Sequence, residues 1–180
     1  MASPAVLELD GYAWRPVHAE DADELDRLAS RGSNRALFNL PATAADFVAG
    51  MGSRGFELPM LCQHGPSSFG AAFVSLRSNR NLNMMVTCFF ATPEVAALAL
   101  ALYVRHLFWS TPFHRVHAQI PLVDGGEAYV ALLTGAGLRE EGVVHGHVMF
   151  GGQPHDLAVL GVLREEFEAW CREKESRLAL

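Results

Sequence analysis

Histidines are the most conspicuous chemistry-bearing residues of this 180-residue chain, and five of the eight lie between positions 114 and 155. His145 and His147 stand two residues apart, a spacing that places both rings on one face of a strand. Two imidazoles supply half of a typical zinc site, which His117, His155 or Asp156 would have to complete. Nothing in the sequence brings these groups together, so we expect no metal site. Exposed histidines are the simpler interpretation of His145 and His147, and substrate contact is the functional one.

Cysteine and carboxylate chemistry offers fewer candidates. The three cysteines are odd in number and form no CxxC pair, which excludes a disulfide framework and a standard zinc finger. They are typical of a reducing compartment and predict a cytoplasmic protein. Cys88 has no neighbour in sequence that would lower its pKa, so a buried apolar role is favoured over a nucleophile. Glu57 directly precedes a strand-like run and is a candidate to face an amine substrate.

The charge and the apolar pattern exclude two classes of partner. Twenty acidic residues against fourteen basic ones give a net charge of −6, whereas proteins that bind nucleic acid need a basic surface. The longest apolar run, 95–104, is too short for a bilayer that requires about 20 residues. We therefore expect neither nucleic acid nor a membrane as partner, and an acidic surface that suits a cationic amine.

A single α/β domain over 1–180, with its core at about 12–168, is predicted to position these residues. Apolar periodicity and turn residues set the boundaries of its elements. Strands are expected at 12–17, 58–63, 69–77, 81–90, 115–120, 138–150 and 155–163, and helices at 22–30, 43–51, 93–109, 127–134 and 163–180. These seven strands predict a mixed, mostly antiparallel sheet flanked by helices. The helix at 93–109 is apolar on nearly every face, which predicts deep burial.

Four segments, in this order, carry a resemblance to a known family. They are WRPVHAEDADELDRLAS, FWSTPFHRVHAQI, GAGLREEG and DLAVLGVLREEF. Together they resemble the GNAT acyltransferases (GCN5-related N-acetyltransferases), especially the branch that contains the ribosomal-protein N-terminal acetyltransferases. The resemblance extends from about residue 12 to about residue 168. Its most specific part is the last segment, in which an Asp, an apolar run and an acidic exit follow at matching intervals.

The resemblance implies acetyl-CoA as the cofactor, held in a sheet that opens between two neighbouring strands. The pantetheine arm would lie in the gap, lined here by Val86, Thr87, Cys88 and Phe89. The pyrophosphate would lie at the start of the next helix, where unpaired N–H groups and the helix dipole favour an anion. In this chain that position corresponds to Glu94, Val95 and Ala96.

The loop at 91–95 departs from the family pattern. The family has two glycines and a basic or Gln residue there, but the sequence is ATPEV. Pro93 removes an N–H, and Glu94 brings a carboxylate towards the phosphates. Like charges at this range cost about 1 kcal/mol when solvated and several when dehydrated. The loop therefore resembles a degenerate pyrophosphate site, although Glu94 is also an ordinary first-turn acid that favours the helix dipole.

The catalytic positions depart as well. Where many family members have a Tyr before the Gly-Phe pair, this chain has Leu133. An Asn and a Ser that begin the same helix in the related branch correspond to Gly126 and Tyr129. Tyr129 is thus the candidate proton donor for the departing thiolate, and a core aromatic is the alternative interpretation. His117, on the strand beside the implied gap, is the candidate general base.

Three functions are consistent with these features. The first is an N-acyltransferase that moves an acetyl group from coenzyme A to a primary amine of a small molecule or peptide by direct attack. The second is a protein with this fold that has lost acetyl-CoA binding and uses the gap for another ligand or reaction. The third is a non-catalytic binding module, in which the charged last helix contacts a partner. A homodimer paired through the last strands is also expected.

Overall fold

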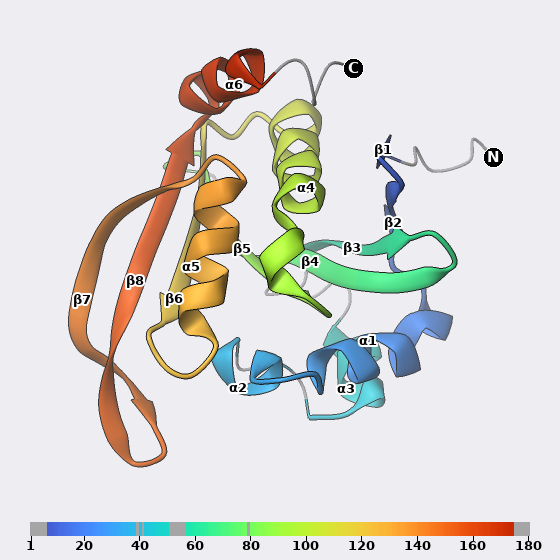
Figure 1. Ribbon diagram of the computed structural model, residues 1–180, viewed down its shortest axis with the longest axis vertical. Helices are drawn as coiled ribbons and strands as arrows, with labels where there is room; N and C mark the ends of the chain where they lie inside the picture. Colours follow the sequence, from blue (N-terminus) through green and yellow to red (C-terminus); the bar gives the residue numbers. More distant parts are fainter. Residues whose placement is uncertain (1–6, 39, 41, 51–56, 79, 175–180) are drawn as a thin grey trace.

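An eight-stranded sheet forms the centre of the protein, as described for residues 7–38, 40, 42–50, 57–78 and 80–174 by a computed structural model. Its strands lie in the order β1-β2-β3-β4-β5-β6-β8-β7 (Figure 1). Their bounds are β1 Leu7–Leu9, β2 Tyr12–Pro16, β3 Glu57–His64, β4 Ser67–Ser78, β5 Asn83–Phe90, β6 Arg115–Pro121, β7 Arg139–Phe150 and β8 Gln153–Leu163. Neighbouring strands are antiparallel except β5 and β6, which are parallel. The sheet thus consists of two antiparallel halves joined by one parallel pair.

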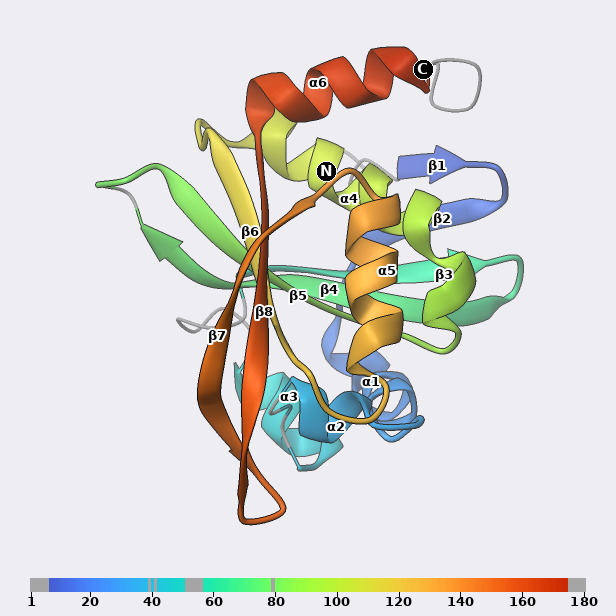
Figure 2. The same ribbon diagram turned by 60° about the vertical axis from the view of Figure 1, so that its left-hand side comes forward.

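Helices cover both faces of the sheet (Figures 1 and 2). On one face lie the short helix η1 (Ala19–Asp21), α1 (Ala22–Ala29), α2 (Asn34–Leu37) and α3 (Ala44–Gly50). The other face carries η2 (Pro93–Val95), α4 (Ala97–Ser110) and α5 (Gly126–Gly135), while α6 (Arg164–Glu173) follows β8 at one end. The larger apolar cluster lies on the α4 and α5 side, and the smaller one lies under α1. Each face of the sheet is therefore covered by a layer of helices.

The predicted fold class is confirmed, with local corrections. The sheet has eight described strands instead of seven, because Leu7–Leu9 pairs with Tyr12–Pro16 through a tight turn. The one-turn helix α2 lies between the predicted helices at 22–30 and 43–51, where no element was predicted. The predicted helix at 93–109 divides into η2 and α4, and α4 is as deeply buried as expected. The last helix is described as far as Glu173, and positions 175–180 lie outside the described residues.

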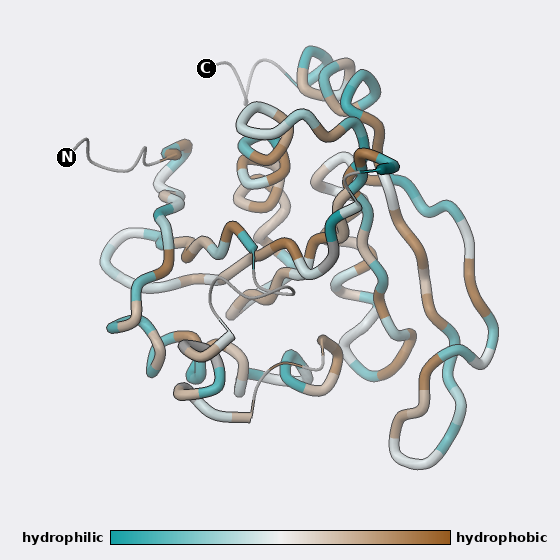
Figure 3. The backbone as a smooth tube through the Cα atoms, turned by 180° about the vertical axis from the view of Figure 1, so that it is seen from behind, coloured by the Kyte–Doolittle hydropathy of each residue, from teal (hydrophilic) through white to brown (hydrophobic). Residues whose placement is uncertain are grey.

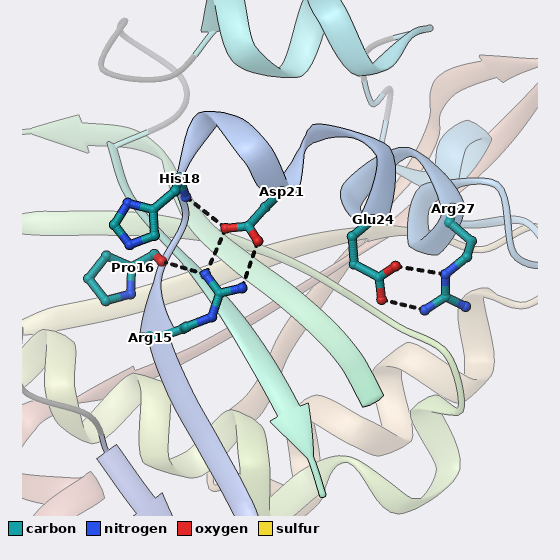
Figure 4. A network of polar contacts seen from close by, with 6 residues as sticks. All are labelled: Arg15, Pro16, His18, Asp21, Glu24 and Arg27. Carbon is teal, nitrogen blue, oxygen red and sulfur yellow. Dashed lines mark hydrogen bonds and ion pairs between the residues drawn. The ribbon is translucent and has the colours of Figure 1, made fainter. Parts of the chain in front are cut away.

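Polar side chains at the ends of elements join the layers. Asp21 accepts hydrogen bonds from both terminal nitrogens of Arg15, at 2.7 and 2.6 Å, and from the backbone N–H of His18 at 2.8 Å (Figure 4). The guanidinium of Arg15 and these hydrogen bonds lower the pKa of the Asp21 carboxyl. This pair connects the end of β2 to the start of α1. The Arg-Pro and acidic residues of the first quoted segment therefore have a structural role.

The last quoted segment makes a similar joint. Arg164 donates hydrogen bonds to the carbonyls of Phe108, Thr111 and Phe113, which connects the start of α6 to the end of α4. Glu166 accepts the backbone N–H of Leu163 at 3.0 Å, so it caps α6. Most residues of this helix are hydrophilic (Figure 3), and Phe167 is its buried residue. Helix capping thus explains the acidic residue Glu166 that follows the last strand.

Candidate active site between two diverging strands

The parallel strands β5 and β6 separate after a short stretch of pairing. Their residues pair only at Asn83 with Arg115, Met84 with Val116, and Met85 with His117. Beyond this point β5 continues to Phe90 and β6 continues to Pro121 without pairing with each other. Figure 2 shows the two halves of the sheet running in different directions from this point. A gap therefore opens in the ladder after Met85, between the two strands where the family resemblance implied one.

The pairing of β5 with β4 determines which backbone groups face this gap. Ala91 donates its N–H to the carbonyl of Phe69 at 2.8 Å. The antiparallel pairing of β5 with β4 continues from there without a shift as far as Val86. In an antiparallel ladder only alternate residues hydrogen-bond to a given neighbour. Phe89 and Thr87 therefore share the orientation of Ala91, towards β4. The N–H and C=O groups of Cys88 and Phe90 face the opposite edge, which is the gap. Val86 has the same orientation, but the pairing of Met85 with His117 places its N–H in the last rung of the β5–β6 ladder, so only its C=O faces the gap.

The predicted lining residues divide accordingly. Of the four, Val86 and Cys88 present backbone groups to the gap. The backbone of Thr87 faces β4, and its hydroxyl donates to the hydroxyl of Ser75 at 3.0 Å. The Phe89 side chain belongs to the smaller apolar cluster. Burial raises the pKa of the Cys88 thiol to about 12, which agrees with the apolar role expected for it.

Phe90, at the wide end of the gap, is contacted by two side chains from distant parts of the chain. Its N–H donates to the Tyr129 hydroxyl at 2.9 Å, and its carbonyl accepts from the Asn34 amide at 3.1 Å. The Tyr129 hydroxyl in turn donates to Oδ1 of Asn34 at 2.6 Å. Both side chains are buried, and burial is the main cause that raises the pKa of Tyr129. The hydroxyl of Tyr129, the candidate proton donor, thus already donates its hydrogen bond to Asn34 within the protein.

A pocket of about 320 Å³ adjoins this junction. It lies where the turn before α2, the loop after β5 and the turn before α5 meet. Its polar lining includes Arg31, Glu94 and Asp124, and its inner wall includes Phe90 and Tyr129. The lining thus carries two carboxylates and one guanidinium, so the pocket favours a cationic or neutral group over an anion.

The loop at 91–96 leaves few backbone donors for an anion. Val95 donates its N–H to Thr92 and Ala96 donates its N–H to Pro93, which closes the turn of η2. The side chains of Glu94 and Val95 are exposed, and Ala96 is buried. The structure thus places the three predicted residues at the start of the helix. It forms no curled glycine loop there.

His117, the candidate base, pairs with Met85 at the point where the strands part. Val116 and Ala118 point into the larger cluster, so the His117 side chain lies on the α1 face of the sheet. Its Nδ1 is buried without a hydrogen-bond partner among the described residues. Burial, with a smaller contribution from the charge of Arg115, lowers the pKa of His117. Both effects favour the neutral imidazole over the charged one.

The three candidate substrate-binding residues lie elsewhere. Glu57 is paired with Arg77, with 3.0 Å between the carboxylate and Nε. His145 is exposed and contacts Asp156 at 3.0 Å, on the long β7–β8 hairpin. A bulge between Val144 and Val148 interrupts the regular alternation on which the shared face of His145 and His147 depended. The structure does not bring Glu57 and these histidines together in one cluster among the described residues.

Asp156 and Asn34 show the limits of the sequence patterns. Asp156 accepts the N–H of Gly146 at 2.8 Å and stabilises the bulge within β7. Asn34 was not a candidate, because an Asn in a polar, irregular stretch gives no signal of burial. Its role depends on contacts with residues 56 and 95 positions away.

The comparisons with known proteins identify the fold. No family model and no curated protein sequence matches the chain. Among solved structures, RimJ of Mycobacterium smegmatis in complex with CoA-disulfide has a TM-score of 0.73 at 18% identity, covering 96% of this chain and 94% of that one. Ribosomal-protein-S5-alanine acetyltransferase of Vibrio fischeri has a TM-score of 0.71 at 13% identity, with coverage of 91% and 98%. Spermidine N-acetyltransferase of Vibrio cholerae, in complex with CoA and spermine, has a TM-score of 0.74 at 12% identity, with coverage of 88% and 98%.

These likenesses extend over nearly the whole length of both chains, and they include the two antiparallel halves on either side of the gap. None of the helices in the described part is long and apolar enough to span a membrane. The structures that resemble the chain include members of the ribosomal-protein branch, to which the four sequence segments pointed. The protein therefore has the fold of the GNAT acetyltransferases.

Proposed function

We propose that this protein is an N-acyltransferase that moves an acetyl group from coenzyme A to a primary amine of a small molecule or peptide. The observation that carries the proposal is the early end of the β5–β6 ladder after Met85 and His117. Two diverging parallel strands leave unpaired backbone on β5, where an extended ligand can pair as an added strand does. The fold likeness to acetyltransferases gives further support.

Coenzyme A fits one part of this site better than the other. The backbone of Val86 and Cys88 suits an extended arm that carries amides. At 91–96 there is no glycine or cation, and Glu94 would oppose a diphosphate. The arm is therefore the main source of affinity in this proposal, and the phosphates contribute little.

The chain's own residues would act mainly on the acceptor. Acetyl-CoA, when bound, would supply an activated thioester. The amine nitrogen would bond to the thioester carbonyl carbon, and the C–S bond would break so that coenzyme A leaves as the thiolate. His117, on the α1 face of the gap, would take the proton that the amine nitrogen loses. Burial on both faces of the sheet would keep water from the thioester.

An amine acceptor agrees with the charges around the gap. The chain has a net charge of −6, and Glu94 and Asp124 line the pocket beside Phe90. A structure of the same fold has been solved with spermine, a polyamine. Carboxylates attract an ammonium group towards the pocket, although the strength of this attraction falls with ionic strength.

A titration with desulfo-CoA, followed by calorimetry and thermal unfolding, tests the proposal. A ligand at 100 times its dissociation constant should stabilise the fold by about 2.7 kcal/mol. Incubation with acetyl-CoA and a panel of amines should then give products heavier by one acetyl group, detected by mass spectrometry. The absence of binding at millimolar desulfo-CoA would refute the proposal.

A second candidate is a protein of this fold that binds another ligand in the gap. The loop at 91–96 and the hydrogen bond from Phe90 to Tyr129 favour it. It predicts no stabilisation by desulfo-CoA or acetyl-CoA, and stabilisation instead by a small cationic or neutral compound that enters the 320 Å³ pocket. The same titration separates the two candidates.

A further inference from the structure

Three residues from separate parts of the chain meet at the wide end of the gap. Asn34 comes from α2 on one face of the sheet and Tyr129 from α5 on the other, and Phe90 ends β5 between them (Figures 1 and 2). Only 4% of Asn34 and 2% of Tyr129 is exposed. The contact therefore closes the gap from both sides.

The hydrogen bonds of this junction are complete. Asn34 donates through its amide nitrogen to the carbonyls of Leu28 and Phe90, each at 3.1 Å, and accepts from the hydroxyl of Tyr129. Phe90 uses both its N–H and its C=O on these side chains. A buried network that is fully satisfied is rigid, and removal of one member leaves the others unpaired.

The same backbone groups are those that an entering ligand needs. Val86, Cys88 and Phe90 form one row along the free edge of β5, and Phe90 is the outermost. An extended arm that carries amides and reaches Cys88 from the loop end passes Phe90 first. The N–H of Phe90 has one proton to donate, so the ligand and the Tyr129 hydroxyl compete for it.

The helices α4 and α5 pack closely near this contact. A Cβ placed on Gly135, near the end of α5, would lie 3.1 Å from the Cβ of Ala97 at the start of α4. Because Tyr129 lies on α5, a ligand that separated these two helices would also displace the Tyr129 hydroxyl.

We propose that Tyr129 and Asn34 form a latch on Phe90 that closes the gap, and that a thioester arm enters only when the phenol leaves the Phe90 N–H. This inference rests on the proposed function and assigns Tyr129 a role in donor access in place of proton donation. The ligand binds only the open fraction of the protein, so its apparent dissociation constant is raised by the inverse of that fraction.

Replacing Tyr129 by Phe tests the latch. The variant keeps the ring but leaves Phe90 N–H and Asn34 Oδ1 unpaired in the closed form, which raises the open fraction. Calorimetry should show desulfo-CoA binding at least about fivefold tighter than to the wild type. Tyr103→Phe is the matched control, because the Tyr103 hydroxyl bonds to the Leu58 carbonyl at 3.0 Å, outside the latch, and its affinity should equal that of the wild type.

The outcomes separate the latch from the function. Equal affinities for Tyr129→Phe and the wild type would overturn the latch and leave the acyltransferase proposal standing. An absence of binding to either protein would overturn both. If Tyr129→Phe does not fold, rapid mixing of the wild type with desulfo-CoA decides the matter. A latch makes the observed binding rate level off at high ligand concentration, and a rate that keeps rising linearly would overturn it.

Discussion

At the scale of single residues, His117 combines the features of a base. Its Nδ1 is unpaired and buried, and the loss of hydration favours the neutral ring. Tyr129 lacks this freedom, since its proton is held by Asn34 and burial raises its pKa. Cys88 is likewise held in the thiol form by burial. His117 is therefore the titratable group in the gap that is best prepared to exchange a proton near neutral pH.

His117→Gln should lower turnover by about 100-fold and abolish the acid limb of the pH profile. In the wild type the pKa of His117 lies below its usual value, so kcat/KM should fall as the pH decreases through that lowered pKa. Steady-state kinetics between pH 5 and 8 measure this. His114→Gln, at an exposed position just before β6, is the control and should retain the wild-type profile. An acid limb that persists in His117→Gln would exclude this histidine as the base.

At the scale of elements, side-chain joints hold the layers around the gap. Asp21 connects β2 to α1 through Arg15, and Arg164 connects β8 and α6 to the end of α4. Trp14 of β2 donates its indole N–H to the Ala99 carbonyl of α4 at 2.7 Å. These contacts fix the helices against the sheet, so the acidic and basic residues of the quoted segments have structural functions.

Asp21→Asn should destabilise the fold by about 2 kcal/mol at pH 7, because it weakens charge-assisted hydrogen bonds in a nearly buried site. The pKa of Asp21 is lowered in the fold, so its stabilisation is present above about pH 4 and is lost as the pH falls through the lowered value. Urea unfolding at pH 7 and pH 3 should show a smaller difference between variant and wild type at pH 3. Asp23→Asn, exposed on α1, is the control and should change stability by less than about 0.5 kcal/mol. An equal difference at both pH values would contradict the assignment.

At the scale of the whole molecule, one parallel junction organises the sheet. The β1–β5 half and the β6–β8–β7 half meet through three residue pairs. The outer strand β7 leaves apolar side chains exposed, namely Val143, Val144, Met149 and Phe150. An exposed strand edge of this kind is where a second copy would pair. The homodimer remains a prediction that this edge supports.

Amide hydrogen exchange across β5 tests the gap directly. Thr87 faces β4 in the ladder and should exchange slowly, whereas Cys88 should exchange faster because β6 has diverged from it. Saturating desulfo-CoA should slow Cys88 by at least about tenfold and leave Thr87 unchanged. Exchange of Cys88 that is unaffected by a bound ligand would show that the ligand lies elsewhere.

The amino-acid sequence determined most of the elements, because periodicity and turn residues act locally. It placed seven of the eight strands, the deeply buried helix, and a loop at 91–96 without glycine or cation. Fewer signals marked the short strand Leu7–Leu9 and the single turn of α2, which are stable only through contacts with the rest of the sheet and helices.

Only the tertiary structure decided what occupies the gap. Asn34 and Tyr129 are 95 residues apart in the chain, so no local pattern predicts that they meet at Phe90. No local pattern predicts the bulge at Gly146 or the ion pair of Glu57 with Arg77. The candidate substrate residues lie on different strands, Glu57 on β3 and the two histidines on β7. Local patterning specifies where strands and helices form, whereas side-chain partners depend on long-range packing.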